Sequence, residues 1–226
     1  MNKTYKLLTF LTVLNVMFQL VSDVTAGKII LLFGFSVSIT VLYFPFVYII
    51  SDVMTEVYGY ARARRVTWLT LISSVVAGLI YLLVAYLPSP DFFTASEAYT
   101  TVFGMVPRIL IGGWIAVFVG DIVNNYIMAR MKVWSNGKHL WIRTIGSTIG
   151  GQFTNTALFY LIALSGVLPS NVLLISIVSA WIIKVAVEAV FTPVTYWVIN
   201  TVKKIEGEDY YDKDTDFNPL SFKIKK

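Results

Sequence analysis

The stretch Val172–Ile199, VLLISIVSAWIIKVAVEAVFTPVTYWVI, decides the fold class of this protein. Its only charged side chains are Lys184 and Glu188. A helix that crosses the hydrocarbon core of a bilayer needs about 20 predominantly apolar residues. This stretch is longer than that, so it predicts a membrane-spanning helix that is tilted or extends beyond the bilayer.

Five further apolar stretches precede it along the chain. They are Tyr5–Val21, Ile29–Ile50, Val66–Leu87, Ile109–Met128 and Ile145–Leu164. Hydrophobic residues make up 57% of the 226 residues and charged residues only 14%, whereas soluble domains carry roughly a quarter charged residues. The sequence therefore predicts an all-α polytopic membrane protein with six transmembrane helices.

The basic residues indicate the orientation of these helices. All lysines and arginines except Lys28, Arg108 and Lys184 lie before or at the start of the first stretch, after the second, between the fourth and fifth, or after the sixth. Basic loops stay on the cytoplasmic side, so we expect both termini to be cytoplasmic in a multi-pass protein of the cell membrane. The net charge of +5 then reflects topology and contact with anionic lipid, and it gives little support for nucleic-acid binding. We expect residues 1–205 to form one transmembrane domain and residues 206–226 a cytoplasmic tail.

The second apolar stretch allows two different helices. If the helix starts where the stretch starts, Asp52 and Glu56 lie among the cytoplasmic headgroups. If Lys28–Phe35 instead forms a short extended segment, the helix runs from about Ser36 to Tyr58, and both carboxylates lie in the inner half of the membrane.

The residues after this stretch favour the second alternative. Tyr58-Gly59-Tyr60 and three arginines are typical of an aromatic belt and a helix stop at the membrane interface. Pro45 would kink this helix and place irregular backbone near a cavity.

Ionisable side chains inside the predicted spans indicate a polar interior. Asp52, Asp121, Lys184 and Glu188 would each cost roughly 2.5–3.5 kcal/mol at the centre of the membrane, so they must face one another, water or a ligand. Asn124 lies on the same helix face as Asp121. A second polar face follows helical spacing on the fifth stretch: Thr148, Gln152, Asn155 and Thr156.

These features also have purely structural interpretations. Lys184 and Glu188 are four residues apart and could neutralise each other. Gln152 and Asn155 could join helices through hydrogen bonds worth about 0.6 kcal/mol each. Polar groups from four helices at similar depths favour one shared chamber over these separate roles.

Several kinds of chemistry find no support in the sequence. The chain has no cysteine and a single histidine, His139, so thiolate and transition-metal sites are not expected. No Gly-x-Ser-x-Gly, His-Glu-x-x-His or Walker motif is present. We therefore expect no enzymatic activity, no catalytic residue, no metal and no cofactor, and no ATP hydrolysis within this chain.

Short motifs in a fixed order extend along nearly the whole chain. They are Phe44-Pro45-Phe46-Val47-Tyr48, residues 52–60, Ala63-Arg64-Arg65, Trp68, Gly120-Asp121 with Asn124, residues 143–148, Gly151-Gln152, Lys184, Glu188, Thr192-Pro193 and Phe217-Asn218-Pro219. Taken together, they resemble the queuosine precursor transporter family, also grouped as a vitamin uptake transporter family. In that family Glu is common at the positions of Asp121 and Gln152, and Asp at that of Asn155, so two amides stand here where carboxylates are usual.

The resemblance implies uptake of 7-deazaguanine bases, such as preQ0, preQ1 or queuine, for tRNA modification. Such a base presents a carbonyl, ring N–H groups and an exocyclic amine, which carboxylates and amides can recognise while aromatic rings stack on its face. The candidates for its edge are Asp52, Asp121, Asn124, Gln152 and Asn155, and the candidate stacking walls are Phe44, Tyr48, Phe159 and Trp181. Lys184 is expected to pair with Asp121 or Asp52, or to donate to the carbonyl. Glu56, Glu188 and Arg143 are candidates for coupling or structural charge.

The sequence leaves the partners of the chain open. The nucleobase and the lipid bilayer are the expected partners, and nucleic acid is not. Transport could rely on proton coupling, on facilitated diffusion, on a homodimer or on a separate energising partner. The alternatives are a substrate-binding subunit of an ATP-driven vitamin importer and a membrane adaptor that transports nothing.

Overall fold

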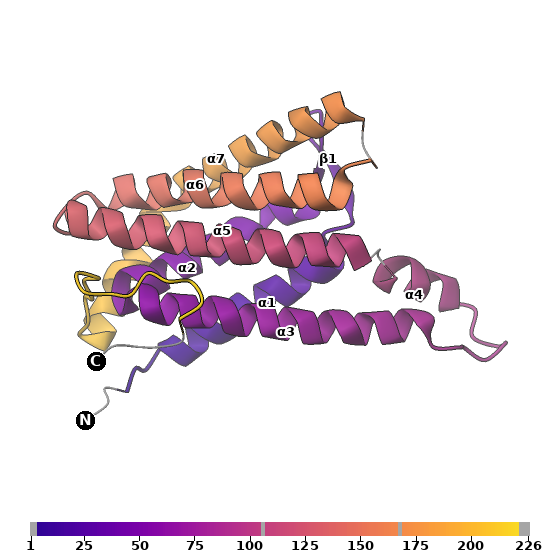
Figure 1. Ribbon diagram of the computed structural model, residues 1–226, viewed down its shortest axis with the longest axis horizontal. Helices are drawn as coiled ribbons and strands as arrows, with labels where there is room; N and C mark the ends of the chain where they lie inside the picture. The colour runs from indigo at the N-terminus through magenta and orange to yellow at the C-terminus, as the bar shows by residue number, and fades with distance from the viewer. Residues whose placement is uncertain (1–3, 105–106, 167–168, 222–226) are drawn as a thin grey trace.

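The computed structural model describes residues 4–104, 107–166 and 169–221, and it is mainly helical (Figure 1). The helices are α1 (Leu8–Thr25), α2 (Phe44–Tyr58), α3 (Tyr60–Tyr86), α4 (Ser96–Phe103), α5 (Pro107–Trp134), α6 (Leu140–Phe159) and α7 (Ser170–Glu206). Between α1 and α2 lie a hairpin of β1 (Ile29–Leu32) and β2 (Phe35–Ser38) and the 3₁₀ turn η1 (Ile39–Leu42). A π-helical turn, η2 (Tyr160–Leu164), continues α6.

Four of the described helices are long and apolar enough to cross a membrane. They are α1, α3, residues Leu110–Trp134 of α5, and α7. Helix α2 has 15 residues, which at 1.5 Å per residue are too few for a 30 Å core. The helical, multi-pass membrane character is thus confirmed, while six spans and cytoplasmic termini stay predictions.

The segment between α1 and α2 contains the extended structure that the sequence favoured. Its two strands pair antiparallel, and the turn between them has positive φ at Phe33 (51°) and Gly34 (84°), as a tight hairpin requires. Helix α2 begins at Phe44 rather than near Ser36, because strand β2 and the turn η1 occupy the intervening residues. The predicted kink at Pro45 is wrong: this proline lies in the first turn of α2, where a missing N–H removes no helical hydrogen bond.

Helix α2 ends where the sequence indicated. Its last residue is Tyr58, and Gly59 has φ of 87°, in the left-handed region that favours glycine. Helix α3 begins at once with Tyr60. The three arginines after it therefore lie in the first turns of α3 and not in a loop.

The long helices run roughly side by side, and the two termini lie at the same end of the molecule (Figure 1). The closest helix pair is α5 with α6. A Cβ atom at Gly120 would stand 2.7 Å from the Cβ of Asn155, and one at Gly151 would stand 2.7 Å from the Cβ of Asn124. Glycine at both positions therefore lets the two backbones meet and brings two amide side chains to the same crossing.

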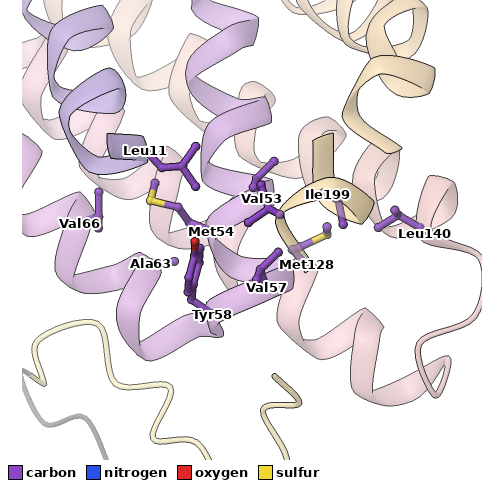
Figure 2. Close-up of a cluster of buried hydrophobic side chains, with 11 residues drawn as sticks. Leu11, Val53, Met54, Val57, Tyr58, Ala63, Val66, Met128, Leu140 and Ile199 are labelled. Atoms are coloured by element: carbon purple, nitrogen blue, oxygen red, sulfur yellow. The ribbon is translucent and has the colours of Figure 1, made fainter. Parts of the chain in front are cut away.

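An apolar cluster packs the end of the bundle near the termini. Figure 2 shows side chains of α2 lying between those of α1, α3, α5, α6 and α7. The cluster consists of Leu11, Val53, Met54, Val57, Tyr58, Ala63, Val66, Met128, Leu140, Ile199 and Val202. This core fixes α2 at the centre of the molecule.

Large apolar side chains on the outer helices are exposed. On α3, Leu79 and Leu83 are more than half exposed, and so are Leu174 and Val190 on α7. In a soluble protein such a surface would be an aggregation hazard, whereas in a bilayer it faces lipid.

Candidate binding site

Buried polar side chains join α2 to α5. The side-chain amide of Asn124 donates to Asp52 Oδ1 at 2.7 Å. Beside this pair, the hydroxyls of Ser51 and Thr55 each donate to Asn125 Oδ1 at 2.8 Å. The hydrogen bonds position Asp52 inside the helix bundle, where its side chain is fully buried.

Helix α3 extends this polar layer through Thr67. The Thr67 hydroxyl lies 3.4 Å from Asp121 Oδ2 and donates to it, while Asn125 Nδ2 donates to the same hydroxyl at 3.4 Å. On the opposite side, the Thr148 hydroxyl of α6 donates to Glu188 Oε1 at 2.6 Å. Five helices thus contribute to one polar interior.

Some of these buried polar atoms have no hydrogen-bond partner among the residues that the structure describes. They are Asp52 Oδ2, Asp121 Oδ1, Asn124 Oδ1, Gln152 Oε1, Gln152 Nε2 and Glu188 Oε2. An unsatisfied buried polar group costs roughly 1–3 kcal/mol. The cluster is therefore suited to a polar ligand that supplies both donors and acceptors.

Lys184 contacts amide and hydroxyl oxygens instead of a carboxylate. Its Nζ donates to Asn155 Oδ1 at 3.2 Å and to Thr156 Oγ1 at 3.3 Å, and it lies 4.8 Å from the centroid of the Phe44 ring. The expected pairing with Asp121 or Asp52 is wrong, because Lys184 forms no ion pair within the described ranges. Glu188, four residues further along α7, does not pair with Lys184 either.

A small cavity of about 60 Å³ opens beside Lys184. It is lined by Gln19, Ser22, Asp23, Ala26, Thr40, Phe44, Gly113, Ala116, Val117, Asn155, Phe159 and Lys184. Its volume suits a few water molecules. The small residues that α5 contributes to the lining leave the space that larger side chains would fill.

Only some of the residues that the sequence predicted to bind the ligand line the cavity. Phe44, Asn155, Phe159 and Lys184 line the cavity. The polar side chains that lie outside its lining, deeper in the polar interior, are Asp52, Asp121, Asn124 and Gln152.

The other two proposed stacking residues lie elsewhere. Tyr48 is buried beneath the cavity, with its ring 5.7 Å from that of Phe44 and its hydroxyl donating to the Gly151 carbonyl at 3.4 Å. Trp181 packs on Phe153 between α6 and α7 and donates to the Ile149 carbonyl at 3.1 Å. Trp181 does not line the cavity, and its stacking role stays a prediction.

The spacing of Asn15 and Gln19 predicts a polar inward face on the first helix, but sequence reasoning missed that Ser22 and Asp23 extend this face to the cavity. Gln19, Ser22 and Asp23 line it, but the first predicted span ends at Val21 and so excludes Asp23. Asp23 continues the spacing of Asn15 and Gln19 at i+8, and this is the signal that could have added it to the predicted face.

A second charged cluster lies at the end of the bundle near the termini. Arg143 makes two hydrogen bonds to the buried Glu56, at 2.9 and 2.7 Å. Lys203 lies 2.7 Å and Lys132 3.3 Å from Glu56 Oε1. Glu56 therefore ties together α2, α5, α6 and α7.

The tail after α7 packs against the same cluster. Asp209 forms ion pairs with Lys132 and Lys203; burial by itself raises the pKa of Asp209, and the two lysines outweigh it and lower that pKa below its ordinary value. Asp212 accepts the Tyr60 backbone N–H at 3.1 Å, and burial raises the pKa of Asp212. The tail is thus docked, and it covers this end of the molecule.

Comparison with known proteins identifies the family. A family model described as "Putative vitamin uptake transporter" matches residues 38–198. The match contains α2 to α6 and most of α7, and so nearly all of the polar interior. The chain belongs to this family of membrane transporters. No solved structure matches the transporter.

Curated relatives carry a more specific description. The transporter is 26% identical over 170 residues to the "Probable queuosine precursor transporter" of Bacillus subtilis, covering 75% of this chain and 74% of the relative. It is 23% identical over 159 residues to the "Queuosine precursor transporter" of Escherichia coli, covering 70% and 69%. The resemblance seen in the motifs is therefore confirmed at the level of the family.

Proposed function

We propose that the transporter imports 7-deazaguanine bases, such as preQ0, preQ1 or queuine, across the cell membrane for tRNA modification, with both termini in the cytoplasm. The observation that carries this proposal is a cavity lined by a lysine, an amide and two aromatic rings, next to polar atoms that have no hydrogen-bond partner among the described residues. The names of the relatives support the substrate class.

The proposed roles follow from the chemistry of the base. Lys184 donates to the ring carbonyl, and the Asn155 amide recognises an adjacent N–H group. Phe44 and Phe159 line the cavity and contact the flat face of the ring, where aromatic pairs are worth about 0.5–1.5 kcal/mol beyond their buried area.

The deeper polar side chains belong to a later step. A bicyclic base is larger than a few water molecules, so it can occupy the site only after the helices around the 60 Å³ cavity separate. Asp52, Asn124, Gln152 and Glu188 would then meet the base on its way to the end covered by the tail. Their unpartnered atoms make this route favourable for a molecule with both donors and acceptors.

Uptake in cells tests the proposal. In a strain that lacks both queuosine synthesis and its own transporter, the gene should restore queuosine in tRNA when a deazaguanine is fed. Replacing Lys184→Ala or Asn155→Ala should abolish this while membrane yield stays normal, because each removes a cavity-lining polar group. The matched controls are Lys204→Ala and Asn171→Ala at exposed positions of α7, which should transport normally; normal uptake by both site variants would remove this site.

Ligand binding in detergent separates a transporter from an adaptor. A base at 100 times its dissociation constant should stabilise the protein by about 2.7 kcal/mol. An adaptor whose polar groups only fix helix packing would show no thermal stabilisation by any deazaguanine.

A further inference from the structure

Asp23 is an acidic residue to which the proposed function assigns no role in recognising the base. It lies in the last turn of α1 and lines the same cavity as Lys184. This wall of the cavity is at the end of α1 away from the termini (Figure 1).

Two neighbouring side chains hold the Asp23 carboxylate in place. Gln19 Nε2 donates to Asp23 Oδ1 at 2.8 Å, and the Ser74 hydroxyl of α3 donates to the other oxygen. Within the described part of the chain no lysine or arginine pairs with Asp23. The carboxylate is therefore fixed in position without a cationic partner in the described ranges.

Two more acceptors lie beside this carboxylate. The Gln19 amide uses its nitrogen for Asp23, and its oxygen, Oε1, is buried without a partner in the described ranges. The Ser22 hydroxyl oxygen is also buried without a described partner. Residues 19, 22 and 23 share one helix face, so this wall presents a carboxylate, an amide oxygen and a hydroxyl oxygen to the cavity.

Three acceptors that include a carboxylate match the three N–H donors of an ammonium group. Lys184 also lines the cavity but forms no ion pair with Asp23 among the described residues, so the two charges stand apart. A ligand between them needs an acceptor at one end and a cationic donor at the other.

We propose that Asp23, with Gln19 and Ser22, binds a protonated amine on the 7-substituent of the base, and that this wall selects amine-bearing deazaguanines over the neutral nitrile. The inference rests on the proposed function and specifies which members of the substrate class are preferred. A nitrile carries only an acceptor nitrogen, so it offers no donor to the Asp23 carboxylate or the Gln19 amide oxygen, and only the Ser22 hydroxyl could donate to it.

Binding measurements on the full-length protein in detergent test the selectivity. The probes are the aminomethyl base and the nitrile base, each titrated against wild type and Asp23→Asn. A hydrogen bond between charged groups predicts that the substitution weakens binding of the aminomethyl base about 10-fold to 100-fold. Binding of the nitrile base should change less than about 2-fold, because the nitrile has no positive charge that the Asp23 carboxylate could bind.

Two further variants keep the result interpretable. Ser22→Ala removes one acceptor with little change in shape, and it should weaken aminomethyl binding severalfold even if Asp23→Asn folds poorly. Asp91→Asn removes an exposed carboxylate of the α3–α4 segment, and unchanged binding of both bases in this control excludes general electrostatic attraction.

The outcomes separate this inference from the proposed function. If wild type binds no deazaguanine, the proposed function fails and the inference fails with it. If wild type binds both bases but Asp23→Asn and Ser22→Ala weaken both equally, or change neither, the selectivity is refuted while the proposed function stands.

Discussion

Glu56 illustrates what one residue contributes in this transporter. It is fully buried and lies within ion-pair distance of Arg143, Lys132 and Lys203. Each cation alone would be costly to bury, and removing one partner of a buried ion pair typically costs about 3–5 kcal/mol. Glu56, together with Asp209, thus makes it possible to bring three positive charges together next to the apolar cluster.

Replacing Glu56→Gln should therefore destabilise the protein strongly. The amide keeps the size of the side chain but leaves the three cations with one anion fewer, so we expect a loss of about 3 kcal/mol. Thermal unfolding in detergent should show a fall of several degrees in Tm. The control Glu97→Gln changes an exposed carboxylate and should leave Tm unchanged; an equal Tm for both variants would contradict the structural role of Glu56.

At the scale of elements, the α5–α6 pair organises the polar interior. The backbones approach so closely that a Cβ atom at Gly151 would stand 3.1 Å from the Gly120 carbonyl oxygen. The crossing places Asn124 against Gly151, in the deeper polar layer, and Asn155 against Gly120, in the cavity wall. The close contact between α5 and α6 thus links the cavity wall to the deeper polar layer on the proposed route.

Gly151→Ala should separate these helices. The new methyl group meets backbone and the Asn124 Cβ, which cannot move independently, and overpacking of this kind costs about 1–3 kcal/mol. Both Tm and base binding should fall. Gly146→Ala is a control on the same helix, because its methyl group meets only the flexible Met131 side chain; equal effects of the two variants would argue against close backbone contact as the cause.

At the scale of the whole molecule, the two ends differ. The end away from the termini has the small cavity with Asp23 and Lys184 in its wall. The other end holds the Glu56 cluster and the docked tail, in which Arg64 donates to the carbonyls of Asp216 and Asn218. We propose that the substrate enters from the cavity side, because ion pairs and the docked tail cover the other end.

The absence of cysteine makes the orientation directly testable. Single cysteines introduced as Thr94→Cys and Asp214→Cys occupy exposed positions at opposite ends. A membrane-impermeant maleimide should label the first in intact cells and the second only after permeabilisation, because the basic segments predict cytoplasmic termini. The parent chain is the unlabelled control, and the reverse pattern would overturn the orientation.

The class of the protein and much of its local structure follow from the amino-acid sequence alone. Long apolar stretches require a membrane, and the helix stop at Tyr58-Gly59 and the extended segment before α2 arise from local residue preferences. The buried positions of Asp52, Asp121, Lys184 and Glu188 were predictable, because charged groups avoid lipid.

The contacts among these side chains depend on how the helices pack in three dimensions. Periodicity tells which residues share a helix face, but it does not tell which helices are neighbours or how each is rotated about its axis. Lys184 therefore contacts Asn155 instead of an acid, Trp181 lies away from the cavity, and Asp23 joins its wall. The contact of Glu56 with Lys203 links residues far apart in the chain, and such pairs form only when the packed helices bring them together.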